Sequence, residues 1–318
     1  MTDLTPVSVP LAPSHLAAVV RNAEWSHAPN TRRAYASALA DFEEWLKRNG
    51  YSVNAGSVSA YLSDLDTAGA ATSTIRSRLA AIASRWPEAR RNPAVESQMK
   101  GIVRRRARGE STRSNASVSK AAFTLAEVKA VCTAEAHTAL ELRDRAMILV
   151  GFWGGFRRSE LVALDWSDIT TGQDGMIATV RVSKTDQEGK QHQKPIARHA
   201  NAAICPVAAL MRWRQLSTVS GAVFVGIVPS TDRLTSKRLT GQVVDLVVKR
   251  RARAAGLHGD YGAHSLRSGL VTTLRKRNVR DRHIKAITGH KTDKMLDHYD
   301  KSPLDDAMRA VADAIAVE

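Results

Sequence analysis

A tyrosine lies near the end of a strongly charged segment, TGHKTDKMLDHYDK, residues 288–301. The segment holds His290 and, nine positions later (299 − 290), Tyr299. A tyrosine usually packs its ring at the edge of a core and leaves its hydroxyl at the surface. Apart from Met295 and Leu296, however, few residues near Tyr299 in the sequence are apolar and could pack against its ring. The phenol is therefore a candidate for chemistry.

Three further stretches place cations beside polar residues. They are GGFRRSEL, with Arg157, Arg158 and Glu160; VSKTDQEGK, with Lys184 and Lys190; and GAHSLRSGL, with His264 and Arg267. On a helix, His264 and Arg267 are three positions apart and share a face. Arginines and histidines that converge on one point can bind the two non-bridging oxygens of a phosphodiester, because the planar guanidinium fork matches phosphate and keeps its charge.

Such a cluster would stabilise the extra negative charge of a pentacoordinate transition state. Tyrosine can supply the in-line nucleophile, although a phenol with a pKa of about 10 needs a base or a cationic cluster to help remove its proton. A lysine or histidine can then protonate the departing 5′ oxygen.

Each motif also has a simpler interpretation. A His-x-x-Arg pair is commonly a surface pair, Gly289-His290 is typical of a helix C-cap, and Arg157 with Glu160 forms an ordinary helix ion pair. Lys184 could be a lysine in a turn that has no catalytic role. Their occurrence together in one chain favours a shared site.

Composition indicates the kind of partner. The 318 residues predict about two domains, and 43% hydrophobic residues are enough for real cores. Lys and Arg number 47 against 31 Asp and Glu, a net charge of +16, which favours a polyanion and above all nucleic acid. An anionic membrane surface is the competing partner, but no basic amphipathic anchor is evident and the longest apolar run, 146–156, is too short to span a bilayer.

The sequence predicts no cofactor. The two cysteines, Cys132 and Cys205, make neither a disulfide framework nor a metal cluster, and there is no glycine-rich phosphate loop. The first residues, MTDLTPVSVPLAP, lack the features of a signal peptide. Reduced thiols therefore predict a cytoplasmic protein.

The chain is expected to have four parts. Residues 1–13 are predicted to be a flexible tail, 14–103 a helical bundle, 104–122 a basic linker and 123–318 a second domain. In the bundle, Tyr35, Leu39, Phe42 and Leu46 form one apolar stripe. The linker is either a solvated tether or, as we expect in so basic a chain, a segment that lies along phosphates.

In the second domain a capping box, Thr124 to Glu127, opens a helix that we expect to end near His137. An apolar helix follows from Ala139 to Phe152. Residues 175–197 alternate like a β-hairpin with Lys184 near its turn. Further helices are predicted at 205–216, 239–255, 264–277, 281–288 and 303–317.

The order Arg, Lys, His-x-x-Arg, His, Tyr resembles that of the tyrosine recombinase (phage integrase) family. GGFRRSEL is similar to the family's Gly-x-Arg-x-x-Glu-Leu motif, a match that selects Arg157 over Arg158. VRVSK resembles the strand that ends in a catalytic lysine, HSLR the His-x-x-Arg motif, and TGH the usual Leu-Gly-His. The step from His290 to Tyr299 has the family's usual length. NTRRAYASALADFEEWL and STIRSRLAAI resemble its helical core-binding domain.

The resemblance implies a set of catalytic residues: Arg157, Lys184, His264, Arg267, His290 and Tyr299, with Glu160 in support. In these roles the tyrosine attacks the phosphate, the arginines and histidines hold the phosphoryl group, and Lys184 protonates the leaving oxygen. Two departures stand out. Ser268 replaces a histidine common in the family, and the turn lacks the usual Gly-Lys-Gly form, so Lys190 stays a second candidate for the acid. No arm-binding domain is expected ahead of the bundle, which favours a compact enzyme of the Xer or Cre type.

These inferences predict a mainly α protein: a helical, SAM-like core-binding domain, followed by an α+β tyrosine recombinase domain with a small antiparallel sheet. The resemblance implies a site-specific DNA recombinase that works through a 3′-phosphotyrosyl bond and a Holliday junction without metal or nucleotide. Candidate DNA contacts are Arg76, Arg78, Arg104, Arg105, Arg106 and Arg108. A type IB topoisomerase-like enzyme and a non-catalytic DNA-binding protein of the same fold are the alternatives.

The resemblance also implies a homotetramer on two double-stranded DNA sites, with no membrane partner. In that assembly the last helix, 303–317, would dock into a neighbouring protomer. Its stripe of Leu304, Met308, Val311 and Ile315 could instead pack on its own domain.

Overall fold

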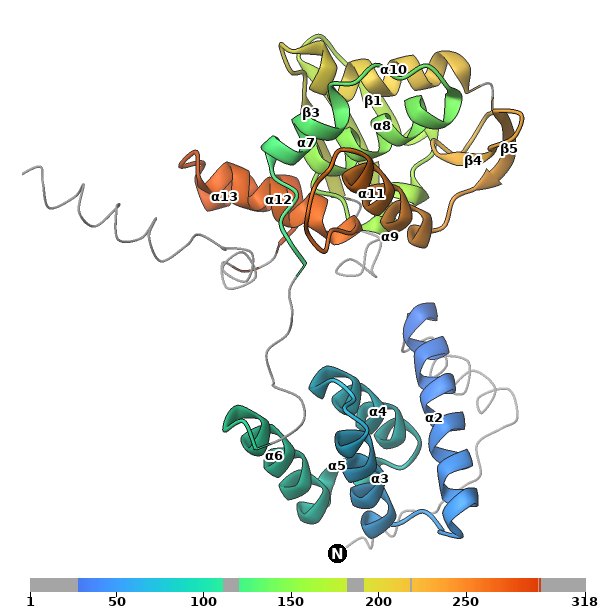
Figure 1. Ribbon diagram of the computed structural model, residues 1–318, viewed down its shortest axis with the longest axis vertical. Helices are drawn as coiled ribbons and strands as arrows, with labels where there is room; N and C mark the ends of the chain where they lie inside the picture. The colour runs from blue at the N-terminus through green and yellow to red at the C-terminus, as the bar shows by residue number, and fades with distance from the viewer. Residues whose placement is uncertain (1–27, 111–119, 182–191, 218, 291, 293–318) are drawn as a thin grey trace, which may run out of the picture. The chain divides into compact units, whose positions relative to one another are not determined.

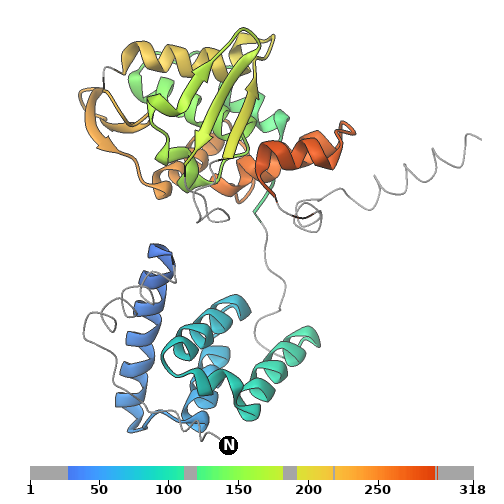
Figure 2. The same cartoon turned by 180° about the vertical axis from the view of Figure 1, so that it is seen from behind.

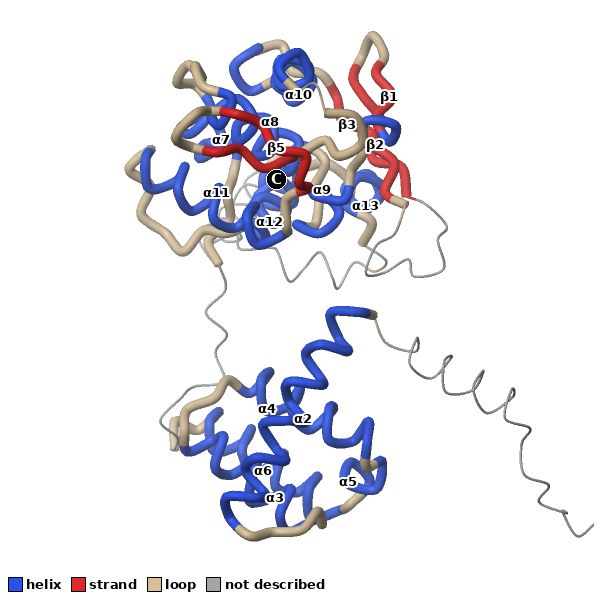
Figure 3. Tube along the Cα trace, turned by 90° about the vertical axis from the view of Figure 1, so that its right-hand side faces the viewer, coloured by secondary structure: helices blue, strands red, loops and turns tan. Residues whose placement is uncertain are grey.

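The computed structural model describes residues 28–110, 120–181, 192–217, 219–290 and 292. It divides into two compact units, Met1–Val118 and Ser119–Glu318. The described part of the first unit is helical, whereas all of the described strands belong to the second unit (Figure 3). The mainly α fold class expected from the sequence is confirmed. The predicted tail, 1–13, and the predicted last helix, 303–317, lie outside the described residues.

The first unit is a bundle of helices around an aromatic centre. The helices are α2 (Pro29–Asn49), α3 (Ala55–Thr67), α4 (Thr72–Arg85), α5 (Pro87–Arg91) and α6 (Pro93–Ala107). The ring centroids of Phe42 and Tyr61 lie 5.0 Å apart in the core. Within the predicted stripe of α2, Phe42 and Leu46 are buried, and Tyr35 and Leu39 are half-buried. The apolar period therefore identified the inner face of this helix.

Local sequence sets the helix ends in this unit. Pro29 occupies the first turn of α2, where a missing N–H costs nothing, and Gly50 ends the helix in the left-handed region at φ 69°. Asn54 caps α3, because its side-chain oxygen accepts a hydrogen bond from the Ser57 N–H at 2.9 Å.

The basic linker begins later than predicted, because α6 continues through Ala107 instead of giving way to extended chain at residue 104. Arg106 reaches back from the last turns of α6 to Asp66 on α3, with Nε to Oδ1 at 2.6 Å. Its Nη1 also donates to Thr72 Oγ1 at 3.1 Å. This buried ion pair holds the end of α6 against α3, which explains why the helix persists.

The second unit contains more helices and two small sheets. Its elements are α7 (Leu125–Cys132), α8 (Ala139–Trp153), α9 (Arg158–Ala163), the 3-10 turn η1 (Trp166–Asp168), β1 (Ile169–Thr171), β2 (Gly175–Val180), β3 (His192–Ala197), the 3-10 turn η2 (Ala202–Ile204), α10 (Pro206–Leu216), β4 (Val225–Val228), β5 (Arg233–Arg238), α11 (Gly241–Ala254), α12 (Ala263–Arg275) and α13 (Asp281–Thr288). The helices gather around α8, which touches α7, α9, α10, α11 and α12 (Figure 1).

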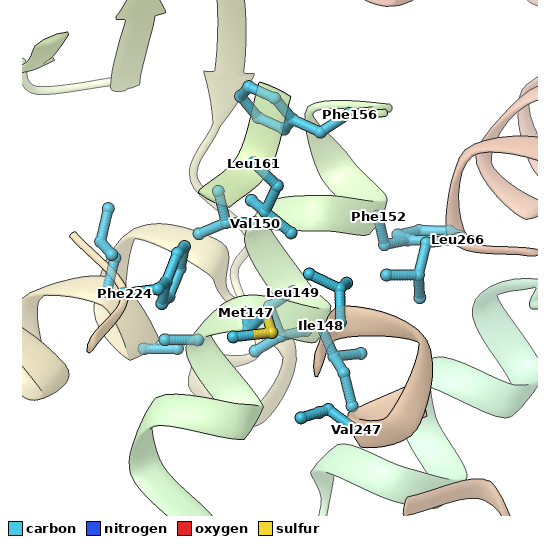
Figure 4. Close-up of a cluster of buried hydrophobic side chains, with 14 of the residues drawn as sticks. Met147, Ile148, Leu149, Val150, Phe152, Phe156, Leu161, Phe224, Val247 and Leu266 are labelled. Atoms are coloured by element: carbon cyan, nitrogen blue, oxygen red, sulfur yellow. The ribbon is translucent and has the colours of Figure 1, made fainter. Parts of the chain in front are cut away.

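Helix α8 is central because its second half, residues 146–153, is apolar on every side. Consecutive residues from Met147 to Val150 are all buried, and their side chains meet Phe224, Val247 and Leu266 from other elements (Figure 4). A helical segment that is hydrophobic all round has to be enclosed. The predicted span, Ala139 to Phe152, differs from the observed one by a single residue.

Helix α7 begins where predicted but ends early. The Glu127 carboxylate accepts a hydrogen bond from the Thr124 N–H at 2.7 Å, as expected for the capping box. The helix stops at Cys132 and not near His137. The intervening residues form the turn that brings the start of α8 to Asp232, whose carboxylate accepts the Ala139 N–H at 2.6 Å. That distant cap is invisible to local periodicity.

The predicted hairpin is present as β2 and β3, which pair in antiparallel fashion with Met176 opposite Ile196. A short strand, β1, which the sequence did not predict, adds to the other edge of β2 in the order β1-β2-β3. The sheet lies on one side of the unit with α13 next to it, packed on β3 (Figure 2). Lys184 and Lys190 fall between β2 and β3, outside the described residues.

A second hairpin, β4 with β5, was also not predicted. The strand RLTSKR in β5 has too little apolar alternation to be recognised, and it forms because it pairs with β4. The last described helix, α13, has the predicted span.

Candidate active site

The GGFRRSEL stretch forms a tight turn that leads into α9. Gly155 has φ 52°, and a Cβ added there would lie 3.0 Å from the Thr288 side chain, so glycine is required twice over. Arg157 follows as the N-cap of α9. Its guanidinium Nη1 lies 2.5 Å from Glu160 Oε1, and its own N–H donates to Glu160 Oε2 at 3.1 Å. The buried Glu160 thereby fixes the direction of Arg157.

Arg267 joins this turn to the end of α13. Its side chain lies on α12 and is 1% exposed. Its Nη1 donates to the carbonyl oxygens of Gly155, at 2.7 Å, and Thr288, at 2.5 Å. His264, one turn earlier, is exposed, yet it is close enough to His290 to contribute to lowering that residue's pKa. The His-x-x-Arg motif therefore has one member at the surface and one inside.

His290 follows the left-handed C-cap of α13, Gly289, at φ 72°. A Cβ at Gly289 would come within 3.3 Å of the His192 ring. Burial, followed by the positive charges of Arg267, Arg157 and Lys194 and the neighbouring His264, lowers the pKa of His290 to about 3. The imidazole is therefore neutral at physiological pH.

The hydroxyl of Thr288 lies between a carbonyl and the ring of His290. Thr288 Oγ1 donates its proton to the Ile284 carbonyl at 2.7 Å. His290 Nδ1 lies 2.8 Å from the same oxygen, and when the hydroxyl proton is directed to Ile284, Nδ1 carries the proton of that contact. The lone pair of the neutral ring then resides on Nε2, which suits accepting a proton.

Lys194, on β3, is a member of the site that sequence reasoning missed. It is 1% exposed, and its Nζ donates to the carbonyls of Ile287 at 2.7 Å and Gly154 at 3.1 Å. Nζ lies 3.9 Å from Glu160 Oε2. The available signal was strand alternation, which puts Lys194 on the same inward face as the buried Ile196.

The structure thus brings together Arg157, Glu160, Arg267 and His290, with His264 at the edge. Tyr299 and Lys184 lie outside the described residues. The cluster combines fixed guanidinium groups with a neutral imidazole, in a setting where burial strengthens their electrostatic effect. Such a site can bind an anionic phosphoryl group and accept a proton beside it.

The predicted DNA-contact residues of the first unit separate into two groups. Arg106 is buried against Asp66, so its assignment as a phosphate contact is wrong. Arg105 also pairs with Asp66, at 2.5 Å, but its side chain is half exposed. Arg78 pairs with Asp41. The remaining candidates are exposed: Arg76, Arg104 and Arg108.

Across the described ranges, His, Cys, Asp and Glu form no group of three that could hold a metal ion. Among the described helices, none is both long and apolar enough to cross a membrane.

Comparison with protein families gives two matches. Residues 122–303 match the model of the phage integrase family, and residues 22–91 match the model of the phage integrase N-terminal SAM-like domain. A similar relative is an integrase/recombinase xerD homolog from Selenomonas ruminantium, 30% identical over 290 residues, which are 88% of this chain and 83% of that protein.

Solved structures with a similar fold include two enzyme–DNA complexes. XerH recombinase bound to palindromic difH in a post-cleavage complex has a TM-score of 0.60 and 18% identity, over 87% of this chain and 78% of that one. A lambda integrase tetramer bound to a Holliday junction has a TM-score of 0.58 and 20% identity, over 89% and 76%. At these identities the likeness concerns the fold.

Proposed function

The chain belongs to the phage integrase family of tyrosine recombinases, and on that premise we propose that it cuts and rejoins duplex DNA at specific sites through a covalent bond to Tyr299. The observation that carries the proposal is the meeting of Arg157, Arg267 and His290 around the Gly154–Gly155 turn. Fixed cations beside a neutral base are what attack on a phosphodiester needs.

The first step exchanges one ester for another. The Tyr299 hydroxyl attacks the scissile phosphorus, the bond to the 5′ oxygen breaks, and the 3′ phosphate stays attached to the tyrosine. Arg157 and Arg267 stabilise the added negative charge of the transition state. Lys184 gives a proton to the leaving 5′ oxygen, with Lys190 as the second candidate for this role.

The neutral state of His290 refines its role. A ring whose Nδ1–H contacts Thr288 presents a lone pair at Nε2. It is therefore better suited to accept the tyrosine proton than to donate to a phosphoryl oxygen. His264, exposed at the start of α12, contributes a donor to the phosphate.

Rejoining uses the same groups in reverse. The 5′ hydroxyl of a partner strand attacks the phosphorus of the phosphotyrosine and releases the tyrosine. The strand exchange proceeds through a Holliday junction. We propose a tetramer on two DNA sites, assembled through exchange of the segment 303–317, and a DNA clamp that includes the exposed Arg76, Arg104 and Arg108. Deleting residues 303–318 should leave binding to one site intact and weaken recombination between two sites.

The central test replaces Tyr299 by phenylalanine. The DNA that is recovered from the host as covalent adducts supplies the sequence of a nicked suicide substrate. This substrate traps the covalent intermediate, which a denaturing gel then detects. We expect no adduct from Tyr299→Phe and nearly unchanged DNA affinity, because binding depends on the basic groups. The control is Tyr261→Phe, at a residue whose ring packs 5.4 Å from Phe123. An adduct that persists in Tyr299→Phe contradicts the assigned nucleophile.

The same assay separates the proposal from its rivals. Exchange between two duplexes indicates recombination, whereas relaxed circles alone indicate a topoisomerase. DNA binding without any adduct from the wild type indicates a non-catalytic protein. The mechanism assigns to arginine and lysine the work that a metal ion does in other phosphoryl-transfer enzymes, so the adduct should form in EDTA. Loss of activity restored by magnesium contradicts it.

A further inference from the structure

Lys194 has no role in the steps above, although it reaches into the same site. Its ammonium group is enclosed by the Ile287 and Gly154 carbonyls, at 2.7 and 3.1 Å, and by the Phe156 ring, whose centroid is 5.0 Å away. With 1% of the side chain exposed, the group is directed to main-chain oxygens and is sealed from solvent. It is therefore not placed to protonate a DNA oxygen, and Lys184 stays the proposed acid.

Lys194 and Arg267 connect the same two segments. Lys194 links Gly154 to Ile287, and Arg267 links Gly155 to Thr288. Arg157 follows the first of these segments directly, and His290 follows the second. Lys194 therefore helps to fix the distance between a phosphate-binding arginine and the proposed base.

The charge of Lys194 depends on its surroundings. Burial lowers its pKa to about 7, nearby Glu160 acts in the opposite direction, and Arg267 and Arg157 lower the pKa further. The groups that face it come from several elements: Arg157 and Glu160 at α9, Arg267 on α12, His192 on β3 and His290 after α13. A negative charge added to this site favours the protonated amine.

We infer that Lys194 is a positioning residue that takes up a proton when a phosphodiester enters the site. The inference rests on the function proposed above. In the empty site the amine is protonated below its pKa and neutral above it. A bound phosphate raises that pKa, so at a pH above the pKa of the empty site binding is accompanied by the net uptake of a proton on Nζ. By linkage, the protonated amine strengthens phosphate binding, and it favours the transition state, with its greater negative charge, still more.

Calorimetry of DNA binding tests this directly. The protein is Tyr299→Phe, so that no bond is cut, and the DNA is the duplex recovered from covalent adducts. Binding enthalpies measured at pH 8 in buffers of different ionisation enthalpy give the number of protons taken up. We expect an uptake approaching one proton in this parent and none after Lys194→Met, which removes the charge at similar length. The matched control, Lys129→Met, changes an exposed lysine of α7 and should retain the uptake.

A pH profile supplies the second readout. In protein with Tyr299 intact, the second-order rate of adduct formation reports groups of the free enzyme. The wild-type rate should fall with rising pH along a one-proton step near pH 7, and Lys194→Met should lack this step and remain on the lower plateau. Lys194→Arg, whose charge is permanent, should restore the upper plateau without the step.

Equal proton uptake in the parent and Lys194→Met overturns the inference. Where Lys194→Met fails to fold, the ¹³Cε resonances of labelled lysine decide, with Lys194 assigned from Lys194→Arg. A midpoint near pH 7 that rises on adding the duplex supports the inference, and an ordinary midpoint of about 10.4 overturns it. Absence of any adduct from wild-type protein would instead refute the proposed function. The two failures can be told apart, because the titration of Lys194 in the free protein does not require DNA cleavage.

Discussion

Arg106 in the first unit and Arg267 in the second are both 1% exposed, but they are held in different ways. Arg106 forms an ion pair with the buried carboxylate of Asp66, with Nη2 to Oδ1 at 2.5 Å. Arg267 donates to the carbonyl oxygens of Gly155 and Thr288. A carboxylate cancels the charge of the cation that it fixes, whereas a carbonyl fixes the cation without cancelling its charge.

The contrast separates cations that stabilise the fold from cations whose charge is available to an anionic ligand. Arg106 stabilises the junction of α3 and α6 and adds little to the field outside the protein. Arg267 keeps its charge for a ligand, and the second unit places Lys194 in the same kind of carbonyl cage. Arg157 is intermediate, because its partner Glu160 also lies 3.9 Å from Lys194. An anion that enters this cluster meets a surplus of positive charge.

The largest effect should come from Arg267→Met. Removing a fixed cation from the transition state should slow adduct formation roughly a thousandfold while leaving DNA affinity within a few-fold, as expected for a lost oxyanion donor. Single-turnover rates on the suicide substrate measure it. Arg106→Met is the matched control and should keep the wild-type rate per folded molecule. Similar slowing in both variants would break the comparison.

Arg106→Met should act on stability instead. It leaves the buried Asp66 carboxylate paired with the half-exposed Arg105, which should lower the free energy of unfolding by about 2 kcal/mol. Urea denaturation followed by circular dichroism measures the change. Adding Asp66→Asn should recover part of the loss, because a buried carboxylate that has lost the fully buried one of its two arginines is then gone. A stability equal to wild type in Arg106→Met would mean that the ion pair is not structural.

Glu160→Gln tests the intermediate position of Arg157, whose charge is partly compensated by Glu160. Loss of the carboxylate that directs Arg157 should slow adduct formation roughly tenfold. Glu160 also raises the pKa of Lys194, so its neutralisation should lower that pKa further. The lysine is protonated only below its pKa, and the pH step of the rate should therefore move to more acidic pH. A step that stays in place or moves to alkaline pH would contradict the assigned neighbour.

The smallest effect concerns the exposed cations of the first unit. Arg108→Ala should weaken DNA binding a few-fold for all sequences and reduce the slope of log affinity against log salt by about one. Fluorescence anisotropy across a salt series measures both quantities. Arg106→Met, at a buried residue in the last turn of the helix that Arg108 caps, should leave the slope unchanged. A lower slope for Arg106→Met would instead indicate that Arg106 contacts the DNA phosphates.

Much of the secondary structure was determined by local sequence. The apolar period of α2, the capping box at Thr124 and the all-apolar run of α8 were sufficient to predict these helices. The span of α13 was predicted from Asp281 to Thr288, as observed. The order of the motif residues was also sufficient to predict the family, because each motif combines residue type with spacing along the chain.

The tertiary structure alone decided what each cation does. Nothing in the run of arginines at 104–108 distinguishes Arg106 from its neighbours, because its partner Asp66 is 40 positions away. Lys194 likewise depends on Gly154, 40 positions earlier, and on Ile287, 93 positions later. Local periodicity specifies which face of a helix or strand turns inward, but the charge state of a buried group depends on acceptors that distant segments bring to it.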